Sequence, residues 1–352
     1  MLVATVVGNR PQFVKAAAVS RRLRERHREL LIHTGQHHDR ELSRVFFEEL
    51  GVPEPDHDLG LGGGDNTAQT ARMLAALGPV LREAAPDVVL VYGDTNSTLA
   101  AALAAAQGGL ALAHVEAGMR SYDRAMPEEV NRVLSDHLAD LLLCPSARAV
   151  ENLRREGIVQ GVIDVGDVMV DVAELTARAA SPQTLDEHGL RPGDYLLVTA
   201  HRAGNVDDAE RLGALMRLLL ALPAPVVLPL HPRTRARLRD AGLLGALERA
   251  LQVTPPLGPL EFAALLRGAR AVLTDSGGVQ KEAYLAGVPC VTLRDRTEWV
   301  ETVQAGWNVL VDLDAAAALA ALERPRPAAH PPLYGDGRAG ERVVAALAER
   351  FD

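Results

Sequence analysis

The chain has 352 residues, and its 37 basic and 46 acidic side chains give a net charge of −9. This balance argues against a general nucleic-acid binder, which carries a basic face for phosphates. Two cysteines exclude a disulfide scaffold, and the start of the chain lacks the basic region and cleavage site of a signal peptide. We therefore expect a soluble cytoplasmic protein, long enough for two domains.

Short apolar runs alternate with longer amphipathic segments along almost the whole chain. The first half predicts strands at 2–7, 30–34, 88–92, 110–114, 141–144 and 162–165. The second half predicts them at 195–199, 226–230, 251–254, 271–274, 290–293 and 309–311. Amphipathic helices are predicted at 13–26, 66–84, 128–139, 207–220 and 260–268. This alternation predicts an α/β protein built of two doubly wound parallel sheets.

Proline-containing segments divide the chain. Segment 173–193 is helical at first and then contains two proline turns, and the proline-rich segment 325–332 precedes a last helix at 337–351. We predict an N-terminal domain over 1–170 and a second domain over 171–334. We expect the terminal segment 335–352 to pack back on the first domain.

Ligands of open parallel sheets bind beyond the carboxyl ends of the strands, where this sequence carries unusual polar residues. After the first strand, a turn at Gly8 leads to Arg10 and Lys15 at a helix start, which suits an anion, although a simple turn with a surface arginine also fits. Asp94 follows a later strand and could instead cap the next helix. Glu116 follows the strand after that, and Glu is a poor cap.

Two more carboxylates, Glu128 and Glu129, follow Pro127 at a helix start, where acids also suit the helix dipole. With Asp94 and Glu116 they make three acidic loops in one domain. Crowded carboxylates raise one another's pKa, as acid and base groups working near neutral pH require. The pattern therefore indicates proton transfer.

The second half carries basic residues and glycines at its strand ends. His201 and Arg202 follow one strand, His231 follows the next, and Arg294 follows a third. The run Ser276-Gly277-Gly278 links a strand to a helix, so its amides and the helix dipole favour a phosphate or diphosphate. A purely conformational glycine turn is the alternative. We expect no metal, because His37 and His38 are adjacent and no histidine or cysteine cluster with ligand spacing exists.

These motifs, in this order, resemble the non-hydrolysing UDP-N-acetylglucosamine 2-epimerase family. The likeness runs from about residue 1 to 312 and rests on six segments, which are Gly8-Asn9-Arg10-Pro11 with Lys15, Tyr92-Gly93-Asp94-Thr95, His114-Val115-Glu116-Ala117-Gly118, residues 126–132, Thr199-Ala200-His201-Arg202 and residues 274–280.

The resemblance implies a GT-B-like fold of two Rossmann-like domains, with a nucleotide sugar in the cleft between them. It implies a homodimer, no cofactor, no nucleic-acid or membrane partner, and a place in cell-surface polysaccharide biosynthesis. The implied reaction removes the proton at sugar C2 with anti-elimination of UDP. UDP then adds back to 2-acetamidoglucal after protonation from the other face, which interconverts UDP-N-acetylglucosamine and UDP-N-acetylmannosamine.

The resemblance also implies roles for individual residues. Asp94, Glu116 and Glu128 are the expected acid and base carboxylates, and His201 is a catalytic or diphosphate-contacting group. The expected UDP-sugar contacts are Arg10, Lys15, Ser276, Gly277, Gly278 and Glu282, with Glu282 on the ribose hydroxyls and Phe262 near the base. We add Arg202, His231 and Arg294 as further contacts at strand ends.

The chain departs from many bacterial members of that family. They carry Glu at the position of Gln12 and Arg at that of Trp299, and segment 121–125 is shorter here. The pattern resembles the archaeal branch and the 2-epimerases of UDP-2,3-diacetamido-2,3-dideoxy-glucuronate, which is therefore an alternative substrate. A GT-B glycosyltransferase and a catalytically silent UDP-sugar sensor are further alternatives, but neither explains three acidic loops in one domain.

Overall fold

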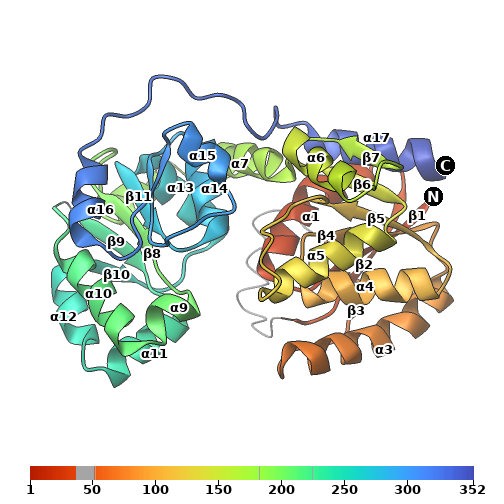
Figure 1. Ribbon diagram of the computed structural model, residues 1–352, viewed down its shortest axis with the longest axis horizontal. Helices are drawn as coiled ribbons and strands as arrows, with labels where there is room; N and C mark the ends of the chain where they lie inside the picture. Colours follow the sequence, from red (N-terminus) through yellow and green to blue (C-terminus); the bar gives the residue numbers. More distant parts are fainter. Residues whose placement is uncertain (37–50, 52, 182, 224) are drawn as a thin grey trace. The chain divides into compact units, whose positions relative to one another are not determined.

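Two fully parallel sheets, one in each half of the chain, form the framework of the protein (Figure 1). The computed structural model describes residues 1–36, 51, 53–181, 183–223 and 225–352. The chain forms two compact units, Met1–Leu175 together with Tyr334–Asp352, and Thr176–Leu333. The predicted class, α/β with two doubly wound sheets, is confirmed.

The sheet of the first unit reverses its winding direction at its centre. Its seven strands lie in the order β3-β2-β1-β4-β5-β6-β7. They are β1 (Leu2–Val7), β2 (Arg28–His33), β3 (His57–Asp58), β4 (Val88–Tyr92), β5 (Ala111–Val115), β6 (Leu141–Cys144) and β7 (Val162–Asp164). Strand β1 pairs with β2 on one side and β4 on the other, so the reversal lies between β1 and β4. Open parallel sheets bind ligands at such a point.

The sheet of the second unit repeats this plan with six strands in the order β10-β9-β8-β11-β12-β13. They are β8 (Leu196–Thr199), β9 (Val226–Pro229), β10 (Gln252–Thr254), β11 (Ala271–Thr274), β12 (Cys290–Thr292) and β13 (Asn308–Leu310). Here the reversal lies between β8 and β11, since β8 pairs with both β9 and β11.

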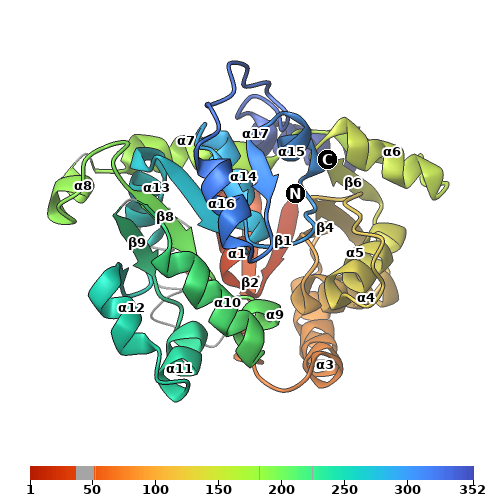
Figure 2. The ribbon, with the colours of Figure 1, turned by 60° about the vertical axis from the view of Figure 1, so that its left-hand side comes forward.

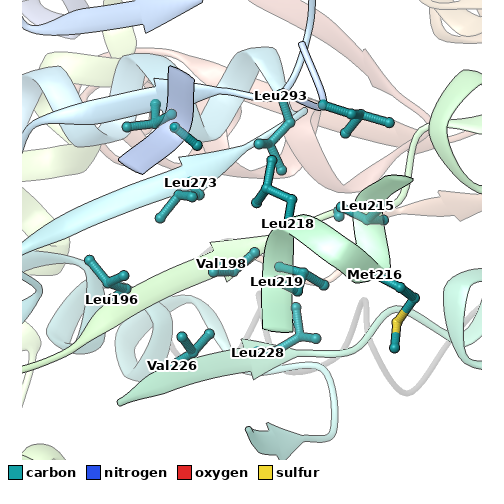
Figure 3. Close-up of a cluster of buried hydrophobic side chains, with 14 of the residues drawn as sticks. Leu196, Val198, Leu215, Met216, Leu218, Leu219, Val226, Leu228, Leu273 and Leu293 are labelled. Atoms are coloured by element: carbon teal, nitrogen blue, oxygen red, sulfur yellow. The ribbon is translucent and has the colours of Figure 1, made fainter. Parts of the chain in front are cut away.

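Apolar helix faces bury both sheets. In the first unit, α3 (Asn66–Ala84) and α4 (Asn96–Gln107) cover one face and share a core with alternate residues of β1 and β4. In the second unit, α10 (Ala209–Leu220) and α16 (Ala315–Leu322) lie on one face of the sheet (Figure 2). Figure 3 shows Leu196 and Val198 of β8 turned toward Leu218 and Leu219 of α10. This packing follows from the period-2 geometry of a strand.

The remaining helices connect or flank the strands. In the first unit they are α1 (Arg10–Leu23), α5 (Pro127–Leu138), α6 (Ala147–Arg155), α7 (Val168–Ala179), which continues into the second unit, and α17 (Ala339–Phe351). In the second they are α8 (Gln183–Glu187), α9 (Ala203–Val206), α11 (Pro232–Asp240), α12 (Leu244–Ala250), α13 (Pro259–Gly268), α14 (Gly277–Leu285) and α15 (Val300–Gln304). Among the residues described, no helix combines the length and apolarity needed to cross a bilayer.

The last helix, α17, belongs to the first unit, although the second unit separates it from the rest of that unit in sequence. The amides of Ala339 and Gly340 each donate to the Asp171 carboxylate of α7 at 3.0 Å. A side chain at Gly340 would lie 2.5 Å from the carbonyl oxygen of Ala18 in α1. The small residue therefore permits a close helix contact.

The structure differs from the predicted elements at short or capped positions. Strand β3 was not predicted, because its two residues are too few to show alternation. Helix α1 begins three residues before the predicted start at residue 13, because the Asn9 side chain caps it by accepting from the Gln12 amide at 3.2 Å. Such caps fix helix starts that apolar periodicity alone does not reveal.

Candidate active site

The strand ends beside the reversal in the first sheet bring the predicted polar residues of that half together. Gly8 follows β1, Asp94 follows β4 by two residues, and Glu116 directly follows β5. Because β1, β4 and β5 are parallel neighbours, these residues lie at one edge of the sheet. This edge is the location that open parallel sheets use for ligands.

Close packing explains the glycine after β1. A side chain at Gly8 would lie 1.9 Å from Ser97 Oγ and 2.4 Å from Thr34 Oγ1. The buried Gln12 side chain accepts from the Gly8 amide at 2.8 Å and donates to the Tyr92 carbonyl at 2.8 Å. Gln12 thus ties the turns after β1 and β4 together. The side chain of Arg10, a predicted contact, lies outside the part of the chain that the structure describes.

Asp94 does not cap the following helix, so the alternative explanation for this residue is wrong. Thr95 caps α4, because its hydroxyl accepts from the Thr98 amide at 3.2 Å. The Asp94 carboxylate instead forms an ion pair with the guanidinium of Arg132 on α5. Arg132 is 7% exposed and also donates to Glu129 at 3.1 Å. Asp94 is therefore held at the edge of a buried charge network.

Glu116 has an unusual backbone conformation and a cationic partner. Its φ of +69° lies in the left-handed region, which residues other than glycine rarely adopt. Its carboxylate forms an ion pair with the ammonium of Lys15, and the two side chains are only 11% and 14% exposed. Sequence analysis placed Lys15 among the ligand contacts, and in the structure it faces this carboxylate.

Glu128 and Glu129 differ in their surroundings. Glu129 is buried, accepts from the amide and hydroxyl of Ser121 at 2.8 Å each, and accepts from the Tyr122 amide at 3.0 Å. Burial acts to raise the pKa of Glu129, but these donors and Arg132 lower it overall. Glu128 is exposed at the start of α5, and no hydrogen bond of its carboxylate is recorded among the described residues. Its catalytic role stays a prediction.

Sequence analysis missed two residues at the heart of this region. Arg132 contacts both Asp94 and Glu129, and its spacing of three residues from Glu129 on a helix was the available signal. His114 is completely buried at the end of β5 and contacts the Gly93 carbonyl. No local pattern distinguishes it from an ordinary core histidine.

The second sheet gathers its predicted residues in the same way. His201, His231, Ser276 and Arg294 follow β8, β9, β11 and β12, which are neighbours in the order β9-β8-β11-β12. The rings of His201 and His231 stack with their centroids 5.4 Å apart. A group of basic side chains therefore lies at one edge of this sheet.

The serine and glycine turn forms the start of α14. Ser276 caps this helix through its hydroxyl, which accepts from the Val279 amide at 3.5 Å. Gly277 and Gly278 do not adopt a positive φ, so the backbone conformation of this turn does not require glycine. The alternative of a purely conformational glycine turn therefore does not apply. Without side chains, these residues leave the amides of the helix start accessible to an anion.

A buried carboxylate fixes this turn to the histidine loop. Asp275 is 0% exposed, and its oxygens accept from the amides of His201 and Arg202 at 3.0 Å. It also accepts from the Asn205 side chain at 3.1 Å. Because Asp275 directly precedes Ser276, it holds both predicted phosphate-contacting segments in one arrangement.

The other predicted contacts near the start of α14 include both basic and acidic side chains. Arg294 donates to Glu298 at 3.0 and 3.2 Å, and Arg202 lies 3.6 Å from the same carboxylate. Burial acts to raise the pKa of Glu298, but the two arginines lower it overall. Glu282 lies in α14 one turn after Gly278, and Phe262 of α13 packs partly buried against the core.

A metal is not supported by the residues described, which contain no group of three or more histidine, cysteine, aspartate or glutamate side chains placed to hold one. His37 and His38 lie outside the described residues. The candidate residues of the first unit are carboxylates paired with cations, and those of the second unit are basic side chains near the glycine-containing start of α14.

The chain is similar to a protein family and to several known relatives. A family model described as UDP-N-acetylglucosamine 2-epimerase matches residues 21–348. The chain is 44% identical to a UDP-N-acetylglucosamine 2-epimerase homolog of Methanococcus maripaludis, over 99% of each chain. It is 46% identical to a UDP-2,3-diacetamido-2,3-dideoxy-D-glucuronate 2-epimerase of Pseudomonas aeruginosa, over 99% of this chain and 100% of the relative.

Solved structures give the same result for the fold. The UDP-GlcNAc 2-epimerase of Methanocaldococcus jannaschii, in complex with UDP-GlcNAc and UDP, matches with a TM-score of 0.91 and 38% identity over 99% of this chain and 100% of that chain. A UDP-glucosyltransferase of Polygonum tinctorium matches in fold alone, with a TM-score of 0.62 and 15% identity over 99% of this chain and 92% of that chain. The predicted GT-B-like fold is confirmed.

Proposed function

The chain belongs to the UDP-N-acetylglucosamine 2-epimerase family and is a nucleotide-sugar 2-epimerase, and from this premise we propose that it interconverts UDP-N-acetylglucosamine and UDP-N-acetylmannosamine. The observation that carries the proposed C2 chemistry is the position of Asp94 and Glu116 at neighbouring strand ends, each paired with a cation. Proton transfer at a carbon needs such groups close together. We propose UDP-N-acetylglucosamine as the sugar because the matching family model and the Methanococcus maripaludis relative are described by that activity.

The reaction we propose breaks two bonds of the sugar in one anti-elimination. A carboxylate takes the proton from C2, the electron pair forms the C1–C2 double bond, and the C1–O bond breaks to release UDP. The 2-acetamidoglucal is then protonated at C2 from the opposite face, and UDP re-forms the bond to C1. Two faces of one carbon exchange protons, so more than one acid or base group is needed, and we assign Asp94, Glu116 and Glu128 to this work.

The second unit is proposed to hold UDP and to stabilise the charge that develops as it leaves. The helix start at Ser276, Gly277 and Gly278 offers amides to the diphosphate, and His201 beside it can donate a proton or a hydrogen bond. The other proposed UDP-sugar contacts are Arg10, Lys15, Arg202, His231, Arg294, Glu282 on the ribose hydroxyls, and Phe262 near the base.

A second candidate substrate is UDP-2,3-diacetamido-2,3-dideoxy-D-glucuronate. The specific observation in its favour is the 46% identity to the Pseudomonas aeruginosa relative, which is close to the 44% identity to the Methanococcus maripaludis one. Both substrates would pass through the same elimination, so the carboxylates do not separate them.

Incubation of the protein with each UDP-sugar in heavy water tests this proposal. Turnover of UDP-N-acetylglucosamine should give both epimers with deuterium at C2, read by proton NMR. Faster exchange and epimerisation of the diacetamido-glucuronate compound would make that sugar the substrate. The absence of both label and epimer with both compounds would contradict the proposed function.

We further propose a homodimer as the working form. Light scattering coupled to size-exclusion chromatography should give twice the chain mass of 37.6 kDa. A monomeric mass at assay concentration would contradict this part of the proposal.

A further inference from the structure

A completely buried histidine connects the two carboxylate-bearing turns of the first unit, and the proposed reaction gives it no role. His114 Nε2 lies 2.7 Å from the Gly93 carbonyl oxygen, and Nδ1 lies 2.7 Å from Asp136 Oδ1 on α5. Gly93 precedes Asp94 directly, and His114 precedes Glu116 by two residues. The His114 ring therefore links the turn that carries Asp94 to helix α5, and α5 in turn contacts the turn that carries Glu116.

Both ring nitrogens of His114 face oxygen acceptors. A carbonyl can only accept, so Nε2 carries hydrogen. Asp136 also accepts from Arg120 at 2.6 Å and from the Gly118 amide at 3.1 Å. Burial acts to raise the pKa of Asp136, but His114 and Arg120 lower it overall. The ring is held from both sides by short polar contacts, to the Gly93 carbonyl and to the Asp136 carboxylate.

A network of ion pairs lies beside this histidine. Arg120 of the loop before α5 donates through two nitrogens to Glu156, at 2.7 Å each, and through a third to Asp136. Arg120 thus pairs with two carboxylates, one of which also contacts the His114 ring. A buried ionic group of this kind is stable only when every charge is paired and hydrogen-bonded, so loss of one member disturbs the rest.

The turn that carries Glu116 needs such external support. Glu116 has a φ of +69° and Gly118 a φ of +77°, and a side chain at Gly118 would lie 2.4 Å from the Ala149 carbonyl oxygen. A left-handed conformation at a residue other than glycine is strained and persists only where surrounding contacts determine it. The bond from the Gly118 amide to Asp136 is one of those contacts.

We propose that His114 is a positioning residue that sets the separation of Asp94 and Glu116, by joining the Gly93 carbonyl to Asp136 and, through Asp136, to the Gly118 amide. It touches no reacting atom. Its effect is on the geometry of the two carboxylates, so its loss lowers turnover and leaves substrate affinity unchanged. The assignment of a catalytic task to those carboxylates rests on the proposed function, whereas the bridge itself does not.

Steady-state kinetics of His114→Gln tests the proposal, because glutamine can donate to one of the two oxygens but presents its own carbonyl to the other. We expect kcat to fall by about 10²-fold, the loss that a displacement near 1 Å produces, with KM within about twofold of the wild type. His33→Gln is the matched control, since His33 is also a buried histidine of the same sheet, at the end of β2. It should leave kcat unchanged.

A double-mutant cycle with Asp136→Asn separates positioning from general destabilisation. If the two residues act as one bridge, the double variant has a kcat no lower than that of the more impaired single variant. Losses in kcat that multiply, an unchanged kcat in His114→Gln, or a rise in KM at constant kcat would each overturn the proposal. Thermal midpoints of all variants show whether a low kcat reflects unfolding.

Nitrogen NMR of the histidine rings tests the bridge without any substrate. The signal that disappears in His114→Gln should show a hydrogen on Nε2 at pH 7.5, and it should shift in Asp136→Asn. A wild-type ring without a hydrogen on Nε2 would overturn the proposed bridge. Failure of the wild type to turn over either UDP-sugar would contradict the proposed function, and the ring signal would still decide the bridge.

Discussion

At the scale of single residues, the two carboxylates at strand ends carry the chemistry we propose. Asp94 and Glu116 each face a cation, Arg132 and Lys15, that orients the carboxylate. Removing the charge while keeping the shape separates a role in proton transfer from a role in holding the fold.

We predict that Asp94→Asn and Glu116→Gln each lower kcat by about 10²–10⁴-fold, the contribution of one positioned acid or base. UDP should still bind to both variants with wild-type affinity in calorimetry, because the UDP contacts we propose lie mainly in the second unit. Glu151→Gln is a suitable control, since Glu151 is an exposed-surface carboxylate of α6 in the same unit. Loss of UDP binding in the first two variants would make these residues structural.

Glu129 gives a prediction about pH. Its pKa is lower in the folded protein than its ordinary value, so its contribution to stability is present above that ordinary value and disappears as pH falls through the folded pKa. We expect Glu129→Gln to destabilise the first unit by about 1–3 kcal/mol at pH 7, because amides of Ser121 and Tyr122 lose an acceptor. The difference from wild type should shrink below about pH 4. A constant difference, measured by urea denaturation between pH 7 and pH 3.5, would contradict this assignment.

At the scale of elements, helix starts and helix contacts decide where side chains lie. Thr95 caps α4 and thereby leaves Asp94 available, while Ser276 caps α14 and places Gly277 at its first position. Gly340 lets α17 pack closely on α1, and α17 belongs to the first unit although it is remote from the rest of that unit in sequence.

We predict that Gly340→Ala destabilises the first unit by about 1–3 kcal/mol, because the new methyl group would lie 2.5 Å from the Ala18 carbonyl and the two helices would have to separate. Gly213→Ala in α10 of the second unit is the control. Its new methyl group would meet only the flexible end of Arg217, 3.5 Å away, and alanine favours a helix over glycine. Chemical denaturation followed by circular dichroism should show opposite shifts for the two variants.

At the scale of the whole molecule, the chain forms two compact units and passes between them twice. Both tryptophans, Trp299 and Trp307, lie in the second unit, so tryptophan fluorescence follows the unfolding of that unit alone. Circular dichroism follows helices of both.

We therefore expect Gly340→Ala to move the transition seen by circular dichroism to lower denaturant and to leave the fluorescence transition in place. Equal shifts of both transitions would show that the units unfold as one body, which is the ordinary test of two-state behaviour. The wild type measured by both probes supplies the reference.

Much of this molecule was predictable from local sequence. Of the thirteen strands in the described residues, twelve correspond to predicted ones, because buried parallel strands are short apolar runs bounded by polar turns. The exception, β3, has two residues and an exposed edge position. The strand ends where Asp94 and Glu116 lie in the first sheet, and His201 and Ser276 in the second, were predictable as well, since parallel strands direct their carboxyl ends to one edge of their sheet.

The partners of those residues could not be predicted in the same way. Arg132 reaches Asp94 across 38 positions of sequence, and Asp275 reaches His201 across 74. The meeting of His114 with Asp136 depends on the packing of α5 beside β5. Such contacts follow from the three-dimensional arrangement of elements and leave no period or spacing in the chain.

The sequence by itself determined the class of fold, the strand ends that carry the chemistry and the excess of acidic over basic charge. The tertiary structure alone decided which cation faces which carboxylate and which contacts hold α17 against α1 and α7. The physical reason is one of range. Propensity, periodicity and capping act within a few residues, whereas ion pairs and helix contacts join segments that only the folded chain brings together.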